Sequence, residues 1–257
     1  MEITVFTSNQ RRHIYLIHEL GKISSKLNII QECDTIFYGQ NYGRYIPSKT
    51  KKKYFIKVEK AQKKIFSSKI LKSKKKFNIL SIKKGDLKFI KKKELNAFLK
   101  SDYYIIFGSS IIKGSLLKFL KKNRAINIHM GISPYYKGTD CNFWAQFDGN
   151  TELVGGTIHY LTEKIDGGDI IFHCRSKVYK NSFFYTMRSV KISIDGLIHY
   201  LKNRKIFKVK TLKQKTTPII RYSKNKEFTD KIINKFLKFK KLKHKNKKYH
   251  LHNLFER

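Results

Sequence analysis

Short apolar runs that alternate with helix-like segments are the feature that most constrains what this chain can fold into. The clearest run reads Asp-Tyr-Tyr-Ile-Ile-Phe at residues 102–107 and stops at Gly108. Continuous apolarity of this length is typical of a parallel strand buried on both faces. Because such runs alternate with helix-like segments, we expect an α/β fold with a doubly wound, mostly parallel sheet. The strands expected in this half are residues 3–7, 27–37, 77–82, 102–107 and 125–129.

Helices are expected between these strands and after them. Residues 182–201 predict a long helix because their apolar side chains recur at intervals of three and four. The polar, basic stretch 39–76 predicts a loop with some helix, and residues 211–222 fit either a strand or a loop. Two further strands are expected at residues 153–161 and 169–178, around an Asp-Gly-Gly turn. The other expected helices are residues 13–22, 92–99, 115–122 and 229–239.

The chain carries a formal net charge of +39, from 57 Lys and Arg against 18 Asp and Glu. Such a charge would suit nucleic acid, because basic side chains neutralise phosphates. However, 48 of the 57 basic residues are Lys, whereas Arg makes the bidentate contacts typical of nucleic-acid recognition. Residues 125–175 reverse the trend with six acidic and three basic side chains. We therefore interpret most of the charge as a compositional bias toward Lys, Ile and Asn, and expect the chemistry within residues 125–175. The lysine-rich block 49–100 fits a solvated surface better than a platform for the acceptor.

Several other classes of protein are excluded by the composition. With 40% hydrophobic and 14% aromatic residues, the chain has enough apolar side chains for a core and is not a disordered basic tail. No run of about 18 apolar residues is present, so no membrane-spanning helix is expected, and the first residues do not resemble a signal peptide. Three widely spaced cysteines form neither a disulfide framework nor a metal-binding pair. We expect a cytoplasmic protein without a metal site.

Three polar residues predict a reactive site. Asn127 and His129 lie at the end of the strand expected at residues 125–129, on one face of the sheet because they are two positions apart. Asp166 follows 37 residues later on a glycine-flanked turn, where the backbone can approach a ligand closely. Ligands of open parallel sheets bind at the carboxyl ends of the strands. Each residue alone would more often be structural, but an amide, an imidazole and a carboxylate together could carry out acyl transfer to an amine.

Four short blocks in this region stand in a recognisable order. The blocks are Asn127-x-His129, Ser133-Pro134-Tyr135-Tyr136-Lys137-Gly138, Gly155-Gly156-Thr157-Ile158-His159 and Ile165-Asp166-Gly167-Gly168-Asp169-Ile170-Ile171. They resemble the tetrahydrofolate-dependent formyltransferase family, which includes glycinamide ribonucleotide, methionyl-tRNA and sugar N-formyltransferases. The resemblance extends with decreasing strength over residues 3–201. It implies a Rossmann-like fold, 10-formyltetrahydrofolate as the formyl donor and an amine as the acceptor.

The resemblance also implies roles for individual residues. Asn127 and His129 would hold the formyl oxygen, and Asp166 would assist proton transfer and orient His129. Folate would contact the loop that follows the strand at residues 102–107 and the turn around Asp166. The implied folate contacts are Ser110, Ile111, Ile112, Lys113, Ile165 and Asp169. Lys137 and His159, which belong to the matching blocks, are expected to contact the acceptor.

Two segments depart from the family pattern. After the reactive histidine, many members read His-Pro-Ser-Leu-Leu-Pro, whereas residues 129–134 read His-Met-Gly-Ile-Ser-Pro. After the first strand, Thr-Ser-Asn-Gln-Arg-Arg-His at residues 7–13 replaces the glycine-rich loop of the purine enzyme. A helix N-terminus attracts anions, so this loop could bind a phosphate of the acceptor, or it could be an ordinary cap with solvated arginines. The candidate side chains are Ser8, Asn9, Gln10 and Arg11.

The acceptor itself is left with alternatives. An aromatic set at Tyr135, Tyr136, Phe143 and Trp144 could stack on a sugar or nucleotide, unless the core buries these rings. We favour an amino group on a small, nucleotide-linked sugar, followed by methionyl-tRNA and then by a non-catalytic RNA-binding relative. The 56 residues after Leu201 are too few for the C-terminal barrel of the methionyl-tRNA enzymes. Activity on tRNA should require the basic residues 226–257, whereas activity on a small sugar should hardly depend on them.

The expected organisation is a catalytic domain followed by a basic tail. Residues 1–203 form the formyltransferase domain, and residues 204–257 form a short lysine-rich C-terminal extension. Within that extension, 10 of the 24 residues from 225 to 248 are Lys. Sugar N-formyltransferases often pair through C-terminal strands, so the resemblance also implies a homodimer.

Overall fold

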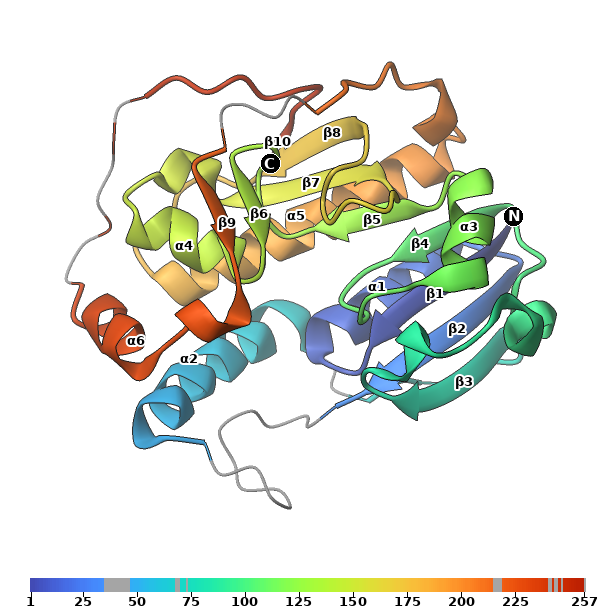
Figure 1. The fold of residues 1–257 in the computed structure, drawn as a ribbon, viewed down its shortest axis with the longest axis horizontal. Coiled ribbons are helices and arrows are strands. Elements are labelled where there is room, and N and C mark those ends of the chain that lie inside the picture. Colours follow the sequence, from blue (N-terminus) through green and yellow to red (C-terminus); the bar gives the residue numbers. More distant parts are fainter. Residues whose placement is uncertain are drawn as a thin grey trace.

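The structure, a computed structural model, describes residues 1–34, 47–67, 70–72, 74–214, 219–239, 242, 245 and 247–256. One large sheet runs through the molecule (Figure 1). Its strands are β1 (Glu2–Ser8), β2 (Lys26–Cys33), β3 (Phe77–Lys83), β4 (Tyr103–Ile106), β5 (Ile126–His129), β7 (Gly155–Tyr160), β8 (Ile170–Arg175) and β10 (Phe255–Glu256). Their order is β10-β8-β7-β5-β4-β1-β2-β3, and all of them except β7 run in the same direction. The sheet is therefore mostly parallel, as the sequence predicts.

Helices cover both faces of this sheet. The α-helices are α1 (Arg11–Ile23), α2 (Lys49–Phe66), α3 (Gly114–Lys122), α4 (Cys141–Phe147), α5 (Ser182–Lys202) and α6 (Asp230–Leu237). Short 3₁₀ helices are η1 (Asp86–Lys88), η2 (Lys92–Phe98), η3 (Thr151–Leu153), η4 (Ile206–Lys208) and η5 (Asn225–Glu227). One core layer joins α1 and α5 to the sheet, and a second joins α3, η1 and η2 to its other face. No helix among the described residues is long and apolar enough to cross a membrane.

The apolar runs of the strands supply both core layers. Val5 of β1 and Ile105 of β4 face the layer that contains α1 and α5. Their chain neighbours Phe6 and Ile106 face the layer that contains α3. Successive side chains of a strand point to opposite faces, so a strand covered on both faces must be apolar throughout. This explains why the run at residues 102–107 identifies a central strand.

The order of the strands in the sheet determines where a ligand can bind. β1 leads to β2 and β3 on one side, and the chain then returns to β4 on the other side of β1. Such a reversal of strand order opens a crevice at the carboxyl ends of the strands. β5 pairs with β4 next to this reversal, so the residues that end β5 lie at the crevice.

The C-terminal segment contributes to both sheets. β9 (Arg221–Ser223) pairs with β6 (Tyr136–Gly138) in a separate two-stranded sheet, and β10 extends the large sheet next to β8. α6 packs beside α2 (Figure 1). Its buried residues Ile233 and Phe236 join a cluster with Tyr54 and Phe143. The division of the chain into residues 1–203 and 204–257 stays a prediction.

Several elements differ from those expected. The stretch 39–76 contains the 18-residue helix α2. The helix buries only a narrow face, and its many lysines obscure the helical pattern of that face in the sequence. Residues 92–98 form a 3₁₀ helix, and β6 and α4 were not expected at all. The strand expected to reach residue 37 ends at Cys33; residues 35–37, like residues 39–46, lie outside the described part of the chain. Of residues 211–222, only the end enters a strand, and residues 215–218 are not described.

Candidate active site

The three residues predicted to be reactive meet at the carboxyl end of β5. Asn127 and His129 lie on β5, opposite His159 and Thr157 of the antiparallel strand β7. Asp166 reaches the same point from the loop that joins β7 to β8. The sheet thus brings together an amide, an imidazole and a carboxylate that are separated in the sequence.

Backbone geometry and hydrogen bonds hold Asp166 in this position. Its φ angle of 48° lies in the left-handed region, which short polar residues tolerate better than most. Its Oδ2 accepts a hydrogen bond from the backbone N–H of Gly138 at 3.0 Å. Gly168 lets the loop close against β7, because a Cβ at this residue would overlap the carbonyl oxygen of Tyr160. The loop therefore fixes the carboxylate from two sides.

His129 and Asp166 form a buried ion pair. Nδ1 of His129 lies 3.1 Å from Oδ1 of Asp166, and the two side chains are 6% and 11% exposed. Nε2 of His129 lies 3.0 Å from the carbonyl oxygen of Tyr136. A carboxylate and a carbonyl only accept hydrogen bonds, so both ring nitrogens donate and the ring is an imidazolium.

The electrostatics of the pair agree with this assignment. Burial lowers the pKa of His129, but the charge of Asp166, the Cys141 sulfur and hydrogen bonds to both raise the pKa well above its usual value. Burial raises the pKa of Asp166, but the charge of His129 and its hydrogen bond reverse this effect and hold the pKa below its usual value. Both groups are therefore charged over the physiological range.

A second histidine orients the side chain of Asn127. Nδ2 of Asn127 lies 3.0 Å from Nε2 of His159, and Nδ1 of His159 lies 2.9 Å from the carbonyl oxygen of Tyr160. Since that carbonyl only accepts, Nδ1 carries the ring proton and Nε2 accepts from the amide. Burial lowers the pKa of His159 to about 4 and keeps the ring neutral. One amide hydrogen of Asn127 is thus directed at His159, and the other can face a ligand.

Two cavities meet at these side chains. The larger has a volume of about 680 Å³ and the smaller a volume of about 160 Å³. Asn127 and Asp166 line both cavities, and His129 lines the larger one. Molecules bound in the two cavities would therefore share the same amide and carboxylate.

The smaller cavity contains most of the predicted folate contacts. Ser110, Ile111, Ile112 and Ile165 line it, and Ile111 and Ile165 are 56% and 50% exposed. Exposed apolar side chains around a hollow are suited to a flat apolar ring. Lys113, at the N-cap position of α3, and Asp169 are not among the lining residues. The role of all six residues as folate contacts stays a prediction.

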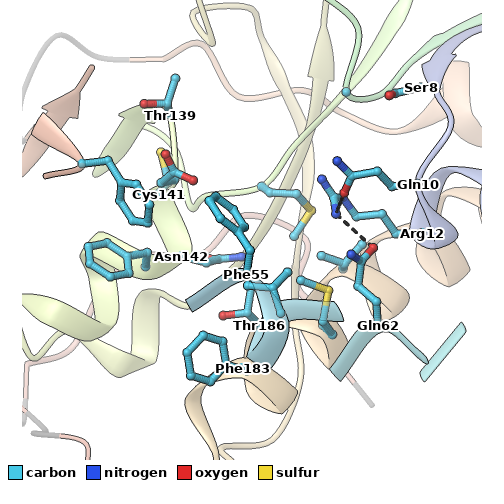
Figure 2. A pocket seen from close by; sticks show the side chains of 18 of the residues that line it. Ser8, Gln10, Arg12, Phe55, Gln62, Thr139, Cys141, Asn142, Phe183 and Thr186 are labelled. Carbon is cyan, nitrogen blue, oxygen red and sulfur yellow. Dashed lines mark hydrogen bonds between the residues drawn. The ribbon is translucent and has the colours of Figure 1, made fainter. Parts of the chain in front are cut away.

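One end of the larger cavity is polar and basic. Ser8 and Gln10, from the loop after β1, line it together with Arg12 and Gln62 (Figure 2). Contact of Ser8 and Gln10 with the acceptor stays a prediction. Arg12 donates hydrogen bonds to the side-chain oxygens of both Gln10 and Gln62. Lys51 and Lys84 also line this cavity. Several cationic groups and the N-terminus of α1 therefore face one space, where they would attract an anion.

The other predicted acceptor contacts lie elsewhere. Asn9 is hydrogen-bonded to the backbone of Asp34, and Arg11 pairs with Glu59 at 2.7 Å. Lys137 lies on β6, where burial lowers the pKa of its amine. His159 lines the smaller cavity. For Asn9, Arg11, Lys137 and His159, contact with the acceptor stays a prediction.

An aromatic wall forms another part of the larger cavity. Phe55 of α2, Phe183 of α5 and Phe228 after η5 are partly exposed and line it. Tyr54 packs within 5.2 Å of Phe183 and 5.1 Å of Phe228, measured between ring centroids, and so joins the three elements. Figure 2 shows Phe55 and Phe183 across the cavity from Arg12 and Gln62. The cavity thus combines a basic end with an apolar one.

The sequence patterns did not predict this aromatic wall. The rings come from α2, α5 and the C-terminal segment, and no motif links these regions. All four rings of the aromatic set proposed from the sequence are buried in the core, and of these four Phe143 also lines the cavity. A signal for α2 was available in Tyr54, Ala61, Gln62 and Phe66, which are its buried residues. No group of three or more His, Cys, Asp or Glu side chains in the described part of the chain is arranged to hold a metal ion.

Both the family models and the curated proteins with similar sequences were compared with this chain. The sequence model of the family described as formyl transferase matches residues 43–190, which is 148 of the 257 residues. Formyltetrahydrofolate deformylase 2 of Arabidopsis thaliana is 41% identical over 61 residues, and methionyl-tRNA formyltransferase of Listeria welshimeri is 44% identical over 61 residues. The matched segments are 24% of this chain and 18% and 19% of those proteins. The match thus spans less than a fifth of the length of these two curated relatives.

Solved structures share the fold. A 4-N formyltransferase from Francisella tularensis has a TM-score of 0.53 at 21% identity, over 88% of this chain and 77% of that one. An N-formyltransferase from Helicobacter canadensis, in complex with folinic acid and dTDP-3-aminofucose, has a TM-score of 0.54 at 12% identity, over 96% and 85%. These TM-scores, at such low identities, show a common fold and nothing more. Because the family model matches more than half of the residues, this chain belongs to the formyl transferase family.

Proposed function

We propose that this protein transfers a formyl group from 10-formyltetrahydrofolate to a primary amine on a nucleotide-linked amino sugar. The observation that carries the proposal is that Asn127 and Asp166 line both cavities. A donor in one cavity and an acceptor in the other would meet at these two side chains. Direct transfer of a group between two molecules requires this kind of juxtaposition.

The three polar side chains suit the chemistry. When an amine attacks a formyl carbon, the carbonyl oxygen gains negative charge and the nitrogen must lose a proton. The second amide hydrogen of Asn127 and the positive charge of His129 would stabilise that oxygen. Asp166, which its ion pair keeps ionised, would accept a hydrogen bond from the amine and assist transfer of its proton. The proton would pass to the donor nitrogen as the bond between that nitrogen and the formyl carbon breaks, which releases tetrahydrofolate.

The smaller cavity supports folate as the donor. When bound, 10-formyltetrahydrofolate would supply the formyl group from a nitrogen atom close to its ring system. Exposed Ile111 and Ile165 offer apolar surface to such a ring, while Asn127 offers an amide hydrogen in the same cavity. The family match and the folinic acid in the Helicobacter canadensis enzyme are in keeping with this choice.

The larger cavity supports a nucleotide-linked sugar as the acceptor. Its volume of about 680 Å³ is in the range of pockets that enclose ligands of this size. Arg12 and Lys51 would neutralise phosphates, and the aromatic wall would stack on a planar base. The amino group of the sugar would then lie at Asp166. The dTDP-3-aminofucose named with the Helicobacter canadensis enzyme is a ligand of this class.

Methionyl-tRNA is a second candidate because of the charge on α2. The outer face of this helix is rich in lysine, and its inner face lines the larger cavity with Tyr54, Phe55 and Gln62. A polyanion bound on the outer face could direct its end into the cavity. The exposed lysines are Lys49, Lys52, Lys53, Lys57, Lys60, Lys63 and Lys64. Nothing in the described residues favours a non-catalytic RNA-binding role over either activity.

A panel of acceptors tests the proposal. Purified protein and 10-formyltetrahydrofolate would be incubated with amino-sugar nucleotides or with methionyl-tRNA, and release of tetrahydrofolate would be followed. We expect turnover with at least one amino-sugar nucleotide and none with methionyl-tRNA. Deleting residues 226–257, which seemed to separate the two candidates, is not a clean test, because Phe228 and Phe236 line the larger cavity. Turnover with methionyl-tRNA alone would favour the second candidate.

A further inference from the structure

A fully buried carboxylate lies beside the smaller cavity. Glu32 is near the end of β2, and its side chain is 0% exposed. No positive charge is paired with it in the described part of the chain; instead, it accepts hydrogen bonds from two loops. Burying a charged group is costly unless hydrogen bonds satisfy it, so these bonds require an explanation.

All three hydrogen bonds run to loops at the carboxyl edge of the sheet. The backbone N–H of Ser110 donates to Oε2 at 2.5 Å, and the Ser110 hydroxyl donates to Oε1 at 2.6 Å. The backbone N–H of Gly85, in the turn after β3, donates to Oε1 at 2.8 Å. Residues 109–112 line the smaller cavity, so Glu32 fixes the wall of that cavity to β2 and β3.

The carboxylate has a different partner from that found in dinucleotide-binding folds. In those folds, an acidic residue about 20 residues after the first loop accepts from a ribose hydroxyl. Glu32 stands 24 residues after Ser8, at the end of β2, but its oxygens are taken by Ser110 and Gly85. In this chain the carboxylate therefore holds the loop of Ser110 at the smaller cavity.

No neutral amide can reproduce this arrangement. A glutamine in either orientation would turn its –NH₂ group toward the backbone N–H of Ser110 or of Gly85. Two donors would then face each other in a buried place, and the loop would have to move. A carboxylate is therefore required to keep residues 109–112 in position.

We propose that Glu32 is a positioning residue that holds the 109–112 loop in the conformation that binds the folate donor. The inference rests on the proposed function, because it assigns the smaller cavity to the donor. Glu32 does not line either cavity, so it acts through Ser110 and its neighbours. Loss of this carboxylate should weaken donor binding and leave the acceptor side and the chemical step intact.

Steady-state kinetics of Glu32→Gln test the proposal. Loss of a buried, charge-assisted hydrogen bond predicts a donor KM about tenfold higher, with kcat and the acceptor KM close to wild type. Ser110→Ala, which removes the hydroxyl but keeps the backbone bond, should raise the donor KM by a smaller factor. Glu19→Gln makes the same chemical change in an exposed pair with Lys22 and should have no effect.

The outcomes separate the two claims. If wild-type protein releases no tetrahydrofolate with any acceptor, the proposed function fails, and the role of Glu32 fails with it. If the wild type turns over and a folded Glu32→Gln variant keeps the wild-type donor KM, the positioning role alone is wrong. A fall in kcat at saturating donor that is as large as the expected rise in donor KM would also overturn the positioning role. Should Glu32→Gln not fold, as judged by circular dichroism, the donor KM of Glu32→Asp decides in the same way, because the shorter side chain keeps the charge but cannot reach Ser110 and Gly85 together.

Discussion

Oδ1 of Asp166 lies 3.1 Å from Nδ1 of His129, although 37 residues separate the two in the chain. The contact arises because β7 pairs with β5 and the loop of Asp166 closes against β7. Both side chains are buried, so each stabilises the charge of the other where water scarcely reaches. The pair therefore supplies a cation and an anion at the junction of two cavities.

The first prediction concerns the pH dependence of stability. The lowered pKa of Asp166 contributes stability above its unfolded pKa, and this is lost as pH falls through the folded value. The raised pKa of His129 contributes stability below its unfolded pKa, and this is lost as pH rises through the folded value. The wild-type protein should thus have a higher free energy of unfolding than the Asp166→Asn variant. The difference should be largest, about 3 kcal/mol, between about pH 4 and 6.5. Urea titrations at a series of pH values would measure this; a difference independent of pH would contradict it.

Asn127→Ala should abolish most activity without unfolding the protein. The substitution removes the amide hydrogen that would face the developing oxyanion, and donors of this kind contribute about 10²- to 10³-fold to kcat. The melting temperature should change little, because Asn127 is partly exposed in the cavities. The measurement is kcat together with thermal unfolding. A variant with more than about a tenth of wild-type kcat would contradict the role.

His159→Leu should lower kcat through Asn127. The ring nitrogen that accepts from the amide is lost, so the side chain of Asn127 is free to turn away from the formyl oxygen. We expect a fall of about tenfold in kcat, in line with the loss of an orienting hydrogen bond. In the double variant with Asn127→Ala, the second substitution should add little. Additive losses would mean that His159 acts independently of Asn127.

Phe228→Ala should raise the acceptor KM and leave the donor KM unchanged. Its ring lines the larger cavity, and stacking against one aromatic ring is worth about 1 kcal/mol, or about fivefold in affinity. Phe89→Ala is the matched control, since Phe89 is 72% exposed and lines neither cavity. Varying each substrate in turn gives both constants. A change in the donor KM alone would argue that the aromatic wall does not face the acceptor.

Reversing the charge of α2 distinguishes the two candidate acceptors. Lys53, Lys57 and Lys60 are exposed on the outer face of the helix and do not line the larger cavity. Replacing all three by Glu should leave kcat/KM for an amino-sugar nucleotide unchanged at physiological salt, because exposed charges are screened. Activity on tRNA would instead fall by orders of magnitude and depend steeply on salt. A loss of sugar activity would show that this face binds the small acceptor.

The reactive residues could be predicted because local spacing determines their position. Asn127 and His129 share one face of a strand, and Asp166 lies on a turn marked by two glycines, so short patterns carried the information. The parallel sheet followed from apolar runs for the same reason. The patterns themselves depend on neighbours in the chain, whereas the approach of Asp166 to His129 also requires the pairing of β7 with β5.

The larger cavity could not be predicted, because contacts between distant segments build it. The loop after β1 suggested Arg11, but one residue turns a helix by about 100°, and Arg12 is the arginine that lines the cavity. The lysines of α2 masked the face that carries Tyr54. Phe228 lies on a C-terminal segment that appeared to be only a basic tail. Each position depends on how elements pack, which local patterns do not determine.

Transfer of a labelled formyl group tests the central claim most directly. The protein would be incubated with ¹³C-formyl-labelled 10-formyltetrahydrofolate and an amino-sugar nucleotide, and the acceptor would be analysed by mass spectrometry. The account predicts that the acceptor gains one labelled formyl group with wild-type protein, and that Asn127→Ala and Asp166→Asn nearly abolish the product. Label that never reaches any acceptor, or that reaches it equally with both variants, would contradict the account.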